Sequence, residues 1–330
     1  MASEDRSERD QKVSIDPRSL LATSLGKLKL ASPIIIASGT FGYGDEYLRV
    51  QGFRLDMVGA IVLKGVTVKP RAGNPAPRIL ETPAGMLNSI GLENIGVEAL
   101  IEEKLPALQG IVPHVIVNVG GDTPEDVIDA AKALSYRQEL FSAIEINVSC
   151  PNLDGRPIGE DADTTARVVT SIRKMYRRPI IVKLVPDSAS IAETARRCEM
   201  AGADALTVAN TFPGMAIDVF TRRPMLGNNY GGLSGPAIKP LTLLLVHRVR
   251  KAVSIPIIAS GGITCARDGI EFIIAGASAI SVGTALFYDA RVCSRIAEGI
   301  VDFLFEDARR RGLDQPRPLR DYVGTLALNS

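Results

Sequence analysis

Short apolar runs rich in β-branched residues recur along the chain, and each predicts a buried strand. Few of them alternate strictly between apolar and polar residues, so both faces of each strand are expected to be covered. The intervening segments are long enough for helices, and Thr123-Pro124-Glu125 is typical of a helix start. The runs cover residues 33–36, 60–63, 115–117, 143–146, 179–182, 205–208, 256–258 and 279–282.

Alternation of eight strands with helices favours an α/β fold, the (β/α)₈ or TIM barrel, over a doubly wound parallel sheet. A weak internal repeat supports the alternation, because residues 201–208 are similar to residues 275–282. Gly202 and Gly276 occupy equivalent places in the repeat and suit the C-terminal ends of helices.

The rest of the chain predicts how the barrel is framed. Residues 21–30 suggest a small N-terminal strand pair in front of the barrel, and long loops are expected over its C-terminal rim. Residues 1–16 are polar and carry both charge signs, which predicts a disordered tail. We therefore expect a single domain over residues 17–330.

The composition points to a small-molecule protein. Lys and Arg number 38 and Asp and Glu 37, so the formal net charge is +1, which argues against binding to nucleic acid or an anionic membrane. No apolar run approaches the ~20 residues of a membrane span, and the N-terminus lacks the apolar stretch of a secretory signal. A cytoplasmic location with reduced thiols is expected.

The cysteines do not form a metal-binding pattern. Cys150, Cys198, Cys265 and Cys293 are scattered, and there are 2 histidines, so no metal site is predicted. Cys198, Cys265 and Cys293 are interpreted as small buried hydrophobic residues. Cys150 follows a predicted strand and precedes Pro151, and it is a candidate base or nucleophile as well as a candidate core cysteine.

Glycines follow the last two predicted strands, where barrels frequently bind phosphate through bare backbone N–H groups. Gly261-Gly262 and Gly283-Thr284 therefore predict a phosphate site, with ordinary turn glycines as the alternative. The glycine-rich segment 231–235 could bring another stretch of backbone to the same ligand.

Two lysines stand at predicted strand ends. Lys64 and Lys183 would be buried there, and a buried ammonium needs an anionic partner, which a ligand can supply. The alternative is a lysine whose stem packs while its charge reaches water. The long segment 74–92 is expected to be a functional loop in which Asn88 clamps a ligand or, alternatively, satisfies local backbone.

Together these segments resemble the dihydroorotate dehydrogenases from about residue 25 to the C-terminus. The resemblance rests on residues 37–42, 63–67, 74–92 and 147–152, on Lys183, on Asn210-Thr211 and on the late glycine pairs. The segment 147–152 contains a cysteine, Cys150, as the soluble class 1 enzymes of this family do. The segments 38–42 and 81–88 are most similar to those of subclass 1B.

The resemblance implies a flavoprotein oxidoreductase of de novo pyrimidine (UMP) biosynthesis that binds FMN and oxidises dihydroorotate to orotate. It also implies a homodimer of catalytic subunits, joined in a heterotetramer by a separate subunit with FAD and a 2Fe–2S cluster that passes electrons to NAD. Fumarate is the alternative acceptor. This chain lacks the clustered cysteines that would ligate such a cluster itself.

The resemblance also implies roles for single residues. Cys150 would be the base that takes the C5 proton, while the C6 hydride passes to FMN. Independently of the resemblance, the segment 153–163 is polar and contains Gly155 and Gly159, so it could act as a lid that excludes water over Cys150. Implied substrate-binding residues are Lys64, Asn88, Ser89, Ile90, Gly91, Leu92, Asn147, Asn210 and Thr211. Implied FMN-binding residues are Ser38, Lys64, Gly65, Asn118, Asn147, Lys183, Ala209, Gly235, Gly261, Gly262, Gly283 and Thr284, the last four around its phosphate.

Three other functions remain open. The first is a related FMN barrel that acts on uracil-type dihydropyrimidines without a carboxylate. The second is a Schiff-base aldolase with Lys183 as nucleophile. The third is a non-catalytic barrel that binds a phosphate ligand.

Overall fold

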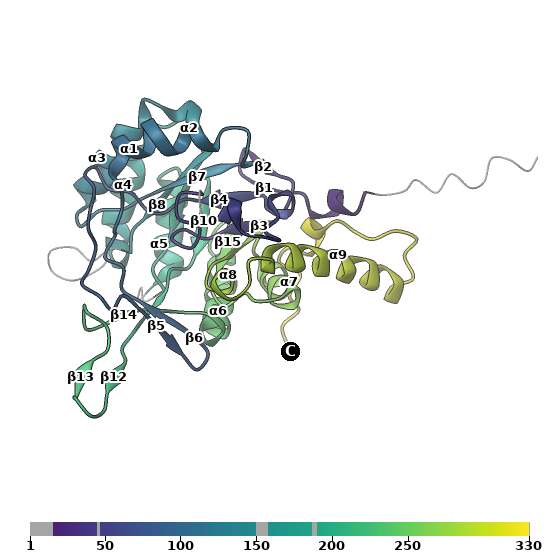
Figure 1. Cartoon of the computed structure of the whole chain (residues 1–330). Helices are drawn as coiled ribbons and strands as arrows, with labels where there is room; N and C mark the ends of the chain where they lie inside the picture. Colours follow the sequence, from purple (N-terminus) through teal and green to yellow (C-terminus); the bar gives the residue numbers. More distant parts are fainter. Residues whose placement is uncertain (1–15, 45–46, 150–157, 187–189, 330) are drawn as a thin grey trace, which may run out of the picture.

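The computed structural model describes residues 16–44, 47–149, 158–186 and 190–329, and the account below is limited to them. Parallel strands close into an eight-stranded barrel in the order β10-β15-β16-β3-β4-β7-β8-β9 (Figure 1). All the predicted strands and the TIM barrel are confirmed, and closure excludes the doubly wound sheet. The barrel strands are β3 (Ile34–Ile36), β4 (Ala60–Val62), β7 (Val115–Val119), β8 (Ala143–Asn147), β9 (Ile180–Lys183), β10 (Ala205–Val208), β15 (Ile257–Ser260) and β16 (Ala279–Val282).

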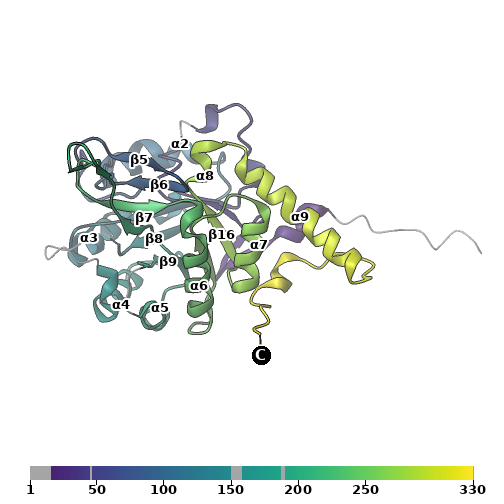
Figure 2. The ribbon, with the colours of Figure 1, turned by 90° about the horizontal axis from the view of Figure 1, so that it is seen from below.

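Helices surround the barrel and cover the outer faces of its strands (Figure 2). The predicted start at Thr123 is confirmed, because its hydroxyl accepts from the Asp126 N–H at 3.1 Å and the Asp126 carboxylate accepts from the Thr123 N–H at 3.0 Å. The helices are α1 (Gly96–Ala99), α2 (Leu105–Leu108), α3 (Pro124–Ser135), α4 (Ala162–Arg173), α5 (Ile191–Met200), α6 (Lys239–Arg250), α7 (Ala266–Ala275), α8 (Ala285–Tyr288) and α9 (Val292–Arg310).

The internal repeat corresponds to two equivalent helix-to-strand turns. Gly202 follows α5 with φ of +99°, and Gly276 follows α7 with φ of +127°. Both turns need a backbone conformation that L-residues rarely adopt, so the predicted helix ends are confirmed.

The predicted N-terminal strand pair is confirmed as an antiparallel hairpin, β1 (Thr23–Leu25) with β2 (Leu28–Leu30). Its leucines are buried in one cluster with the side chains that fill the N-terminal half of the barrel. We call this cluster the apolar layer. It consists of Leu25, Leu28, Leu30, Ile35, Ala60, Val62, Ile116, Ala143, Ile181, Ala205, Ile258 and Ala279.

Strand side chains alternate between faces, so the residue two positions further along also points into the barrel. At that level the interior becomes polar. We call these residues the polar layer; they are Asn118, Glu145, Lys183, Thr207, Ser260 and Ser281. The same strands therefore build an apolar N-terminal half and a polar C-terminal half.

A separate sheet, in the order β11-β14-β6-β5, lies at the C-terminal end of the barrel. The segment 74–92, expected to be a loop, instead contains β5 (Ile79–Thr82) and β6 (Gly85–Asn88). Its strand β6 pairs with β14 (Gly231–Ser234), which in turn pairs with β11 (Phe212–Gly214). Gly85 allows this pairing, since a Cβ there would come within 2.0 Å of the Ser234 carbonyl oxygen.

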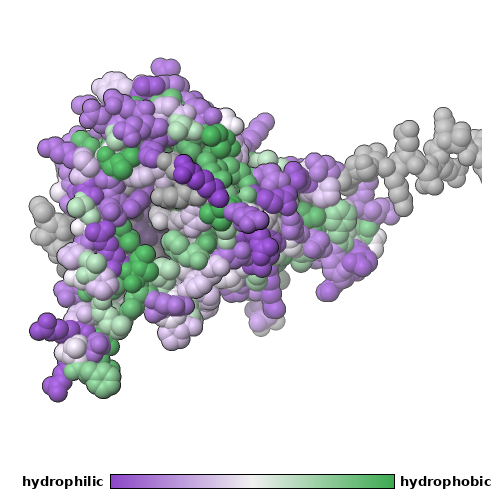
Figure 3. Space-filling view, viewed as in Figure 1, coloured by the Kyte–Doolittle hydropathy of each residue, from purple (hydrophilic) through white to green (hydrophobic). Residues whose placement is uncertain are grey.

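A second short hairpin, β12 (Ile217–Asp218) with β13 (Arg223–Pro224), extends from this sheet. It projects away from the barrel in the ribbon and in the space-filling view (Figures 1 and 3). Phe220 lies at its turn with 93% of its surface exposed.

Candidate active site

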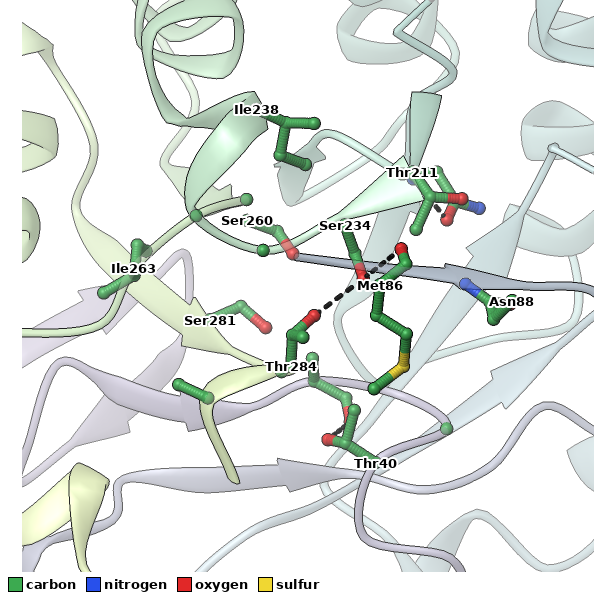
Figure 4. A pocket seen from close by; sticks show the side chains of 18 of the residues that line it. Thr40, Met86, Asn88, Thr211, Ser234, Ile238, Ser260, Ile263, Ser281 and Thr284 are labelled. Atoms are coloured by element: carbon green, nitrogen blue, oxygen red, sulfur yellow. Dashed lines mark hydrogen bonds between the residues drawn. The ribbon is translucent and has the colours of Figure 1, made fainter. Parts of the chain in front are cut away.

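A cavity of about 210 Å³ opens at the C-terminal ends of the barrel strands, between the strand ends and the four-stranded sheet (Figure 4). Its walls come from segments far apart in the sequence, as expected where all the strands of a barrel end at one rim. The predicted site residues that line it are Ser38, Asn88, Ile90, Lys183, Ala209, Asn210, Thr211, Gly235, Gly261, Gly262, Gly283 and Thr284.

Glycines form one side of this cavity. Gly261 and Gly262 have φ of +147° and +74°. A Cβ on Gly261 would lie 2.5 Å from the Thr242 hydroxyl oxygen, and a Cβ on Gly262 would lie 2.7 Å from the Lys239 backbone nitrogen. The buried Thr242 hydroxyl forms no hydrogen bond with the described residues. The bare backbone of the loop after β15 thus packs closely against α6, which carries Thr242.

Asp268 of α7 holds the loop after β15 in place through hydrogen bonds. Its carboxylate accepts from the Thr264 N–H at 2.9 Å and the Cys265 N–H at 3.1 Å, and the Lys239 ammonium lies 2.7 Å from it. Burial alone would raise the pKa of Asp268, but the hydrogen bonds from Lys239, Thr264 and Cys265 outweigh it and lower that pKa to about 2. The ionised carboxylate therefore stabilises the loop.

The four-stranded sheet is joined to the rim by one hydrogen bond. The Thr284 hydroxyl, which follows β16, donates to the Ser234 hydroxyl of β14 at 2.7 Å (Figure 4). This contact holds the sheet against the strand end that also carries Gly283.

Lys183 contributes a positively charged side chain to the cavity wall. It is the last residue of β9, where its register partners are Asn147 of β8 and Thr207 of β10. No described carboxylate forms an ion pair with it. A ligand anion, or negative charge that builds up on a ligand, would supply the partner that a half-buried ammonium needs.

Amide side chains from three elements meet beside Lys183. The Asn147 Oδ1 accepts from the Ser149 N–H at 3.2 Å and from the Asn210 Nδ2 at 3.3 Å. The Asn88 Nδ2 donates to the Gly232 carbonyl at 3.2 Å. Paired amides can match the alternating donors and acceptors of a planar heterocycle.

Asn118 and Glu145 lie below the cavity and are almost fully buried, with 1% and 2% of their surface exposed. The Asn118 Nδ2 donates to Glu145 Oε1 at 2.7 Å, and the Thr207 hydroxyl donates to Glu145 Oε2 at 2.7 Å. The Asn118 Oδ1 has no partner among the described residues and lies beside Gly65.

Sequence reasoning missed Glu145, although a signal was present. Glu145 interrupts the apolar run 143–146. A buried carboxylate needs a polar partner just as the buried ammonium of Lys183 does. Ser260 and Ser281 also line the cavity and were missed. Each serine comes two positions after a residue of the apolar layer on the same strand, Ile258 for Ser260 and Ala279 for Ser281.

Some predicted site residues do not line the cavity. Lys64 instead lies 3.4 Å from Glu93, which Arg78 also contacts at 3.0 Å. The positive charge of Lys64 contributes most to the lowered pKa of Glu93. The anionic partner predicted for Lys64 thus exists within the protein. The residues outside the lining are Lys64, Gly65, Ser89, Gly91, Leu92, Asn118 and Asn147.

The predicted base, Cys150, lies outside the described residues, as do residues 153–157 of the predicted lid. Cys198 and Cys293 are buried as predicted, and burial raises the pKa of each thiol to about 12. The same prediction is wrong for Cys265, which is exposed because it stands at the start of α7.

Two searches of the described part of the chain gave negative results. Its His, Cys, Asp and Glu side chains nowhere gather in a group of three that could hold a metal ion. None of its helices combines the length and the apolar character needed to span a membrane.

Comparison with known proteins gives consistent matches. The family model described as dihydroorotate dehydrogenase matches residues 20–304. A protein of Trichlorobacter lovleyi named "Dihydroorotate dehydrogenase B (NAD(+)), catalytic subunit" is 48% identical over 288 residues, which is 87% of this chain and 94% of the relative. Proteins of the same name from Desulforamulus reducens and Pelobacter propionicus are 48% identical over 289 residues (87% of this chain, 94% of the relative) and 46% identical over 308 residues (93% and 98%).

Proposed function

The chain belongs to the dihydroorotate dehydrogenase family, and we propose that it is the catalytic subunit of a type B, NAD-linked enzyme that oxidises dihydroorotate to orotate in pyrimidine biosynthesis. The observation that carries this proposal is the position of Lys183, a cation without a described ionic partner, in one cavity with the glycine loops, with Asn88 of β6 and with Asn210, which follows β10. The names of the relatives support the subunit type and the acceptor.

The residues present fit FMN. A phosphate suits the bare backbone of the loops at Gly261-Gly262 and Gly283-Thr284, which line the cavity. Gly39 lines the same cavity, and a Cβ there would meet no atom within 4 Å, so the space beside it is open to a ligand. Ser38, Gly65, Asn118, Asn147, Ala209 and Gly235 complete the proposed FMN contacts, together with Lys64 and Lys183.

When bound, FMN supplies the acceptor for the hydride that leaves C6 of dihydroorotate. Lys183 stabilises negative charge at the flavin end of the cavity. Cys150 removes the C5 proton, for which its thiolate is the active form. Asn88, Asn147, Asn210 and Thr211 orient the pyrimidine ring and carboxylate, with Lys64 and the backbone of Ser89, Ile90, Gly91 and Leu92.

Several properties of the assembly follow from the same proposal. The chain pairs with a second copy and with a separate subunit that carries FAD and a 2Fe–2S cluster and reduces NAD. Residues 17–330 form one FMN-binding domain after a tail at 1–16, of which the structure describes Asp16, the residue that caps the first turn. The cytoplasmic location and the lid over the site also stay predictions.

The test is flavin bleaching without oxygen. The purified chain, loaded with FMN, is mixed with dihydroorotate and separately with dihydrouracil, and the flavin absorbance is followed. We expect dihydroorotate to bleach the flavin and dihydrouracil to leave it oxidised, because dihydrouracil lacks the carboxylate for which the substrate contacts above are proposed. Equal bleaching by both would favour the uracil-type alternative, and a protein that neither compound reduces would contradict the proposal.

The variant Lys183→Met gives a second reading in the same experiment. A methionine fills similar space without the charge, so reduction by dihydroorotate should slow by ~10²-fold or more. Borohydride trapping of a carbonyl substrate on wild-type Lys183 would instead support the aldolase alternative.

A further inference from the structure

The buried acid beneath the cavity has no part in the roles given above. Glu145 is in the middle of β8, and its carboxyl oxygens accept one hydrogen bond each, from Asn118 of β7 and Thr207 of β10. β8 and β10 are not neighbours in the barrel, so the bond to Thr207 crosses the interior. A buried carboxylate is costly to desolvate, and hydrophobic residues fill the rest of the barrel below it.

The first consequence of this arrangement concerns Asn118. The NH₂ group of Asn118 faces Glu145, because its Nδ2 donates to Glu145 Oε1 at 2.7 Å. The Asn118 Oδ1 is thereby left on the other side, beside Gly65, where a Cβ would approach it to 2.6 Å. That oxygen is buried and has no described partner. Glu145 therefore fixes Asn118 as a hydrogen-bond acceptor.

The second consequence is electrostatic. Glu145 and Lys183 both belong to the polar layer, and Thr207 touches the first and is the register partner of the second. The two charges nevertheless form no described ion pair within 4 Å. Lys183 reaches the cavity, whereas Glu145 stays beneath it. A ligand in the cavity thus meets the Lys183 ammonium on its wall and lies above the Glu145 carboxyl group.

We propose that Glu145 is a positioning residue that orients the Asn118 amide as an acceptor for the flavin ring and that holds the FMN reduction potential down by opposing Lys183. The inference rests on the proposed function. Reduction adds negative charge to the flavin, so a nearby carboxylate disfavours the reduced form and an ammonium favours it. Low dielectric in the barrel interior makes both effects large.

The test compares two variants that separate charge from hydrogen bonding. Glu145→Gln keeps the shape and a carbonyl acceptor for Asn118 but removes the charge. Thr207→Val keeps the charge of Glu145 and removes one hydrogen bond to it. FMN midpoint potentials are measured by spectroelectrochemistry on the FMN-loaded chain, together with melting temperatures and FMN dissociation constants.

We expect Glu145→Gln to make the potential more positive, so that reduced FMN gains at least about tenfold in affinity relative to oxidised FMN, which is about 30 mV for a two-electron couple. Thr207→Val should shift the potential much less, although both variants melt at lower temperature. A Glu145→Gln protein that binds FMN with the wild-type potential overturns this inference alone. A wild-type chain that binds no FMN overturns the proposed function and this inference together.

Discussion

The two ends of the barrel interior differ in chemistry although the same strands build both. At the N-terminal end, the apolar layer is sealed by the leucines of the β1–β2 hairpin. At the C-terminal end, the polar layer and the glycine loops enclose the cavity. Every residue of the apolar layer is hydrophobic. The C-terminal end carries buried polar groups that contribute little to folding unless they are satisfied.

The residues that mainly stabilise the fold therefore lie at the N-terminal end of the barrel, and the residues proposed to bind ligands lie at its C-terminal end. Substitutions in the apolar layer should reduce the free energy of unfolding and spare the chemistry, while substitutions at the polar end should act on the chemistry whether or not they also reduce stability. Substitutions at each end, made one at a time, test this division.

The largest effect is expected at the polar end. Cys150→Ser should lower turnover ~10²- to 10⁴-fold near neutral pH, because a hydroxyl is a far weaker base than a thiolate. Wild-type turnover should rise with pH, because the thiolate is the active form and a free cysteine has a pKa of about 8.5. Steady-state rates from pH 6 to 9 check both points.

The control for Cys150 is Cys265→Ser, which changes an exposed thiol at the start of α7. It should leave turnover unchanged, and both variants should bind FMN and orotate as the wild type does. Undiminished turnover in Cys150→Ser would remove that residue from the role of base.

At the apolar end, Ile116→Ala should lower the free energy of unfolding by about 2–5 kcal/mol, since it opens a cavity in a fully buried cluster. Denaturant unfolding measures the loss, and the flavin spectrum of the folded variant should match the wild type. A normal stability combined with lost FMN would show that the two ends are not separate.

A substitution of Asp268 tests whether the loop after β15, which lines the cavity, also contributes to the free energy of unfolding. Asp268→Asn should cost about 2 kcal/mol at pH 7, because the folded-state pKa of about 2 lies below the ordinary value of 3.8. A lowered pKa stabilises the fold fully above about pH 4 and progressively less as the pH falls toward 2. The difference from wild type should therefore be about half as large at pH 3.

The control for Asp268 is Glu271→Gln, which removes the other carboxylate on Lys239 but leaves the hydrogen bonds to Thr264 and Cys265. Urea unfolding at pH 7 and pH 3 compares the three proteins. A difference that does not change with pH would contradict the assigned titration.

The smallest effects concern two glycines at opposite ends. Gly39 (φ +88°) lines the active-site cavity, and Gly110 (φ +74°) lines a separate cavity beside the N-terminal ends of β7 and β8. A Cβ on either would meet nothing within 4 Å, so substitution by alanine costs mainly backbone strain, about 1 kcal/mol.

Only Gly39→Ala should also weaken FMN binding, by a few-fold, because its methyl group enters the ligand cavity. Fluorescence titration with FMN measures this. Equal FMN affinities in the two variants would mean that the space beside Gly39 is not used by the ligand.

The barrel could be predicted from the sequence because each of its strands is a local apolar run. The four-stranded sheet could not, since the pair that links its two halves joins segments as distant as Asn88 and Gly232, and β14 begins with two glycines instead of a strand-like pattern. The hydrogen bond from Asn118 to Glu145 was hidden for a similar reason: it joins neighbouring strands whose side chains meet only in the closed interior.

Sequence reasoning placed most accurately those site residues whose position depends only on the order of strands and loops. Gly261, Gly262 and Gly283 follow strands directly, so their place at the rim comes from the order of elements. Lys64 shows the limit of that reasoning. Its need for an anion was foreseen, but Glu93 lies well beyond it in the sequence and was not considered as the partner.

The central claim is that the polar end of this barrel holds FMN, and the flavin content of the purified chain tests it most directly. After incubation with excess FMN and gel filtration, the account predicts a yellow protein with about one flavin per chain. It also predicts an absorbance that dihydroorotate bleaches in the absence of oxygen. A folded protein that leaves the column colourless would contradict it.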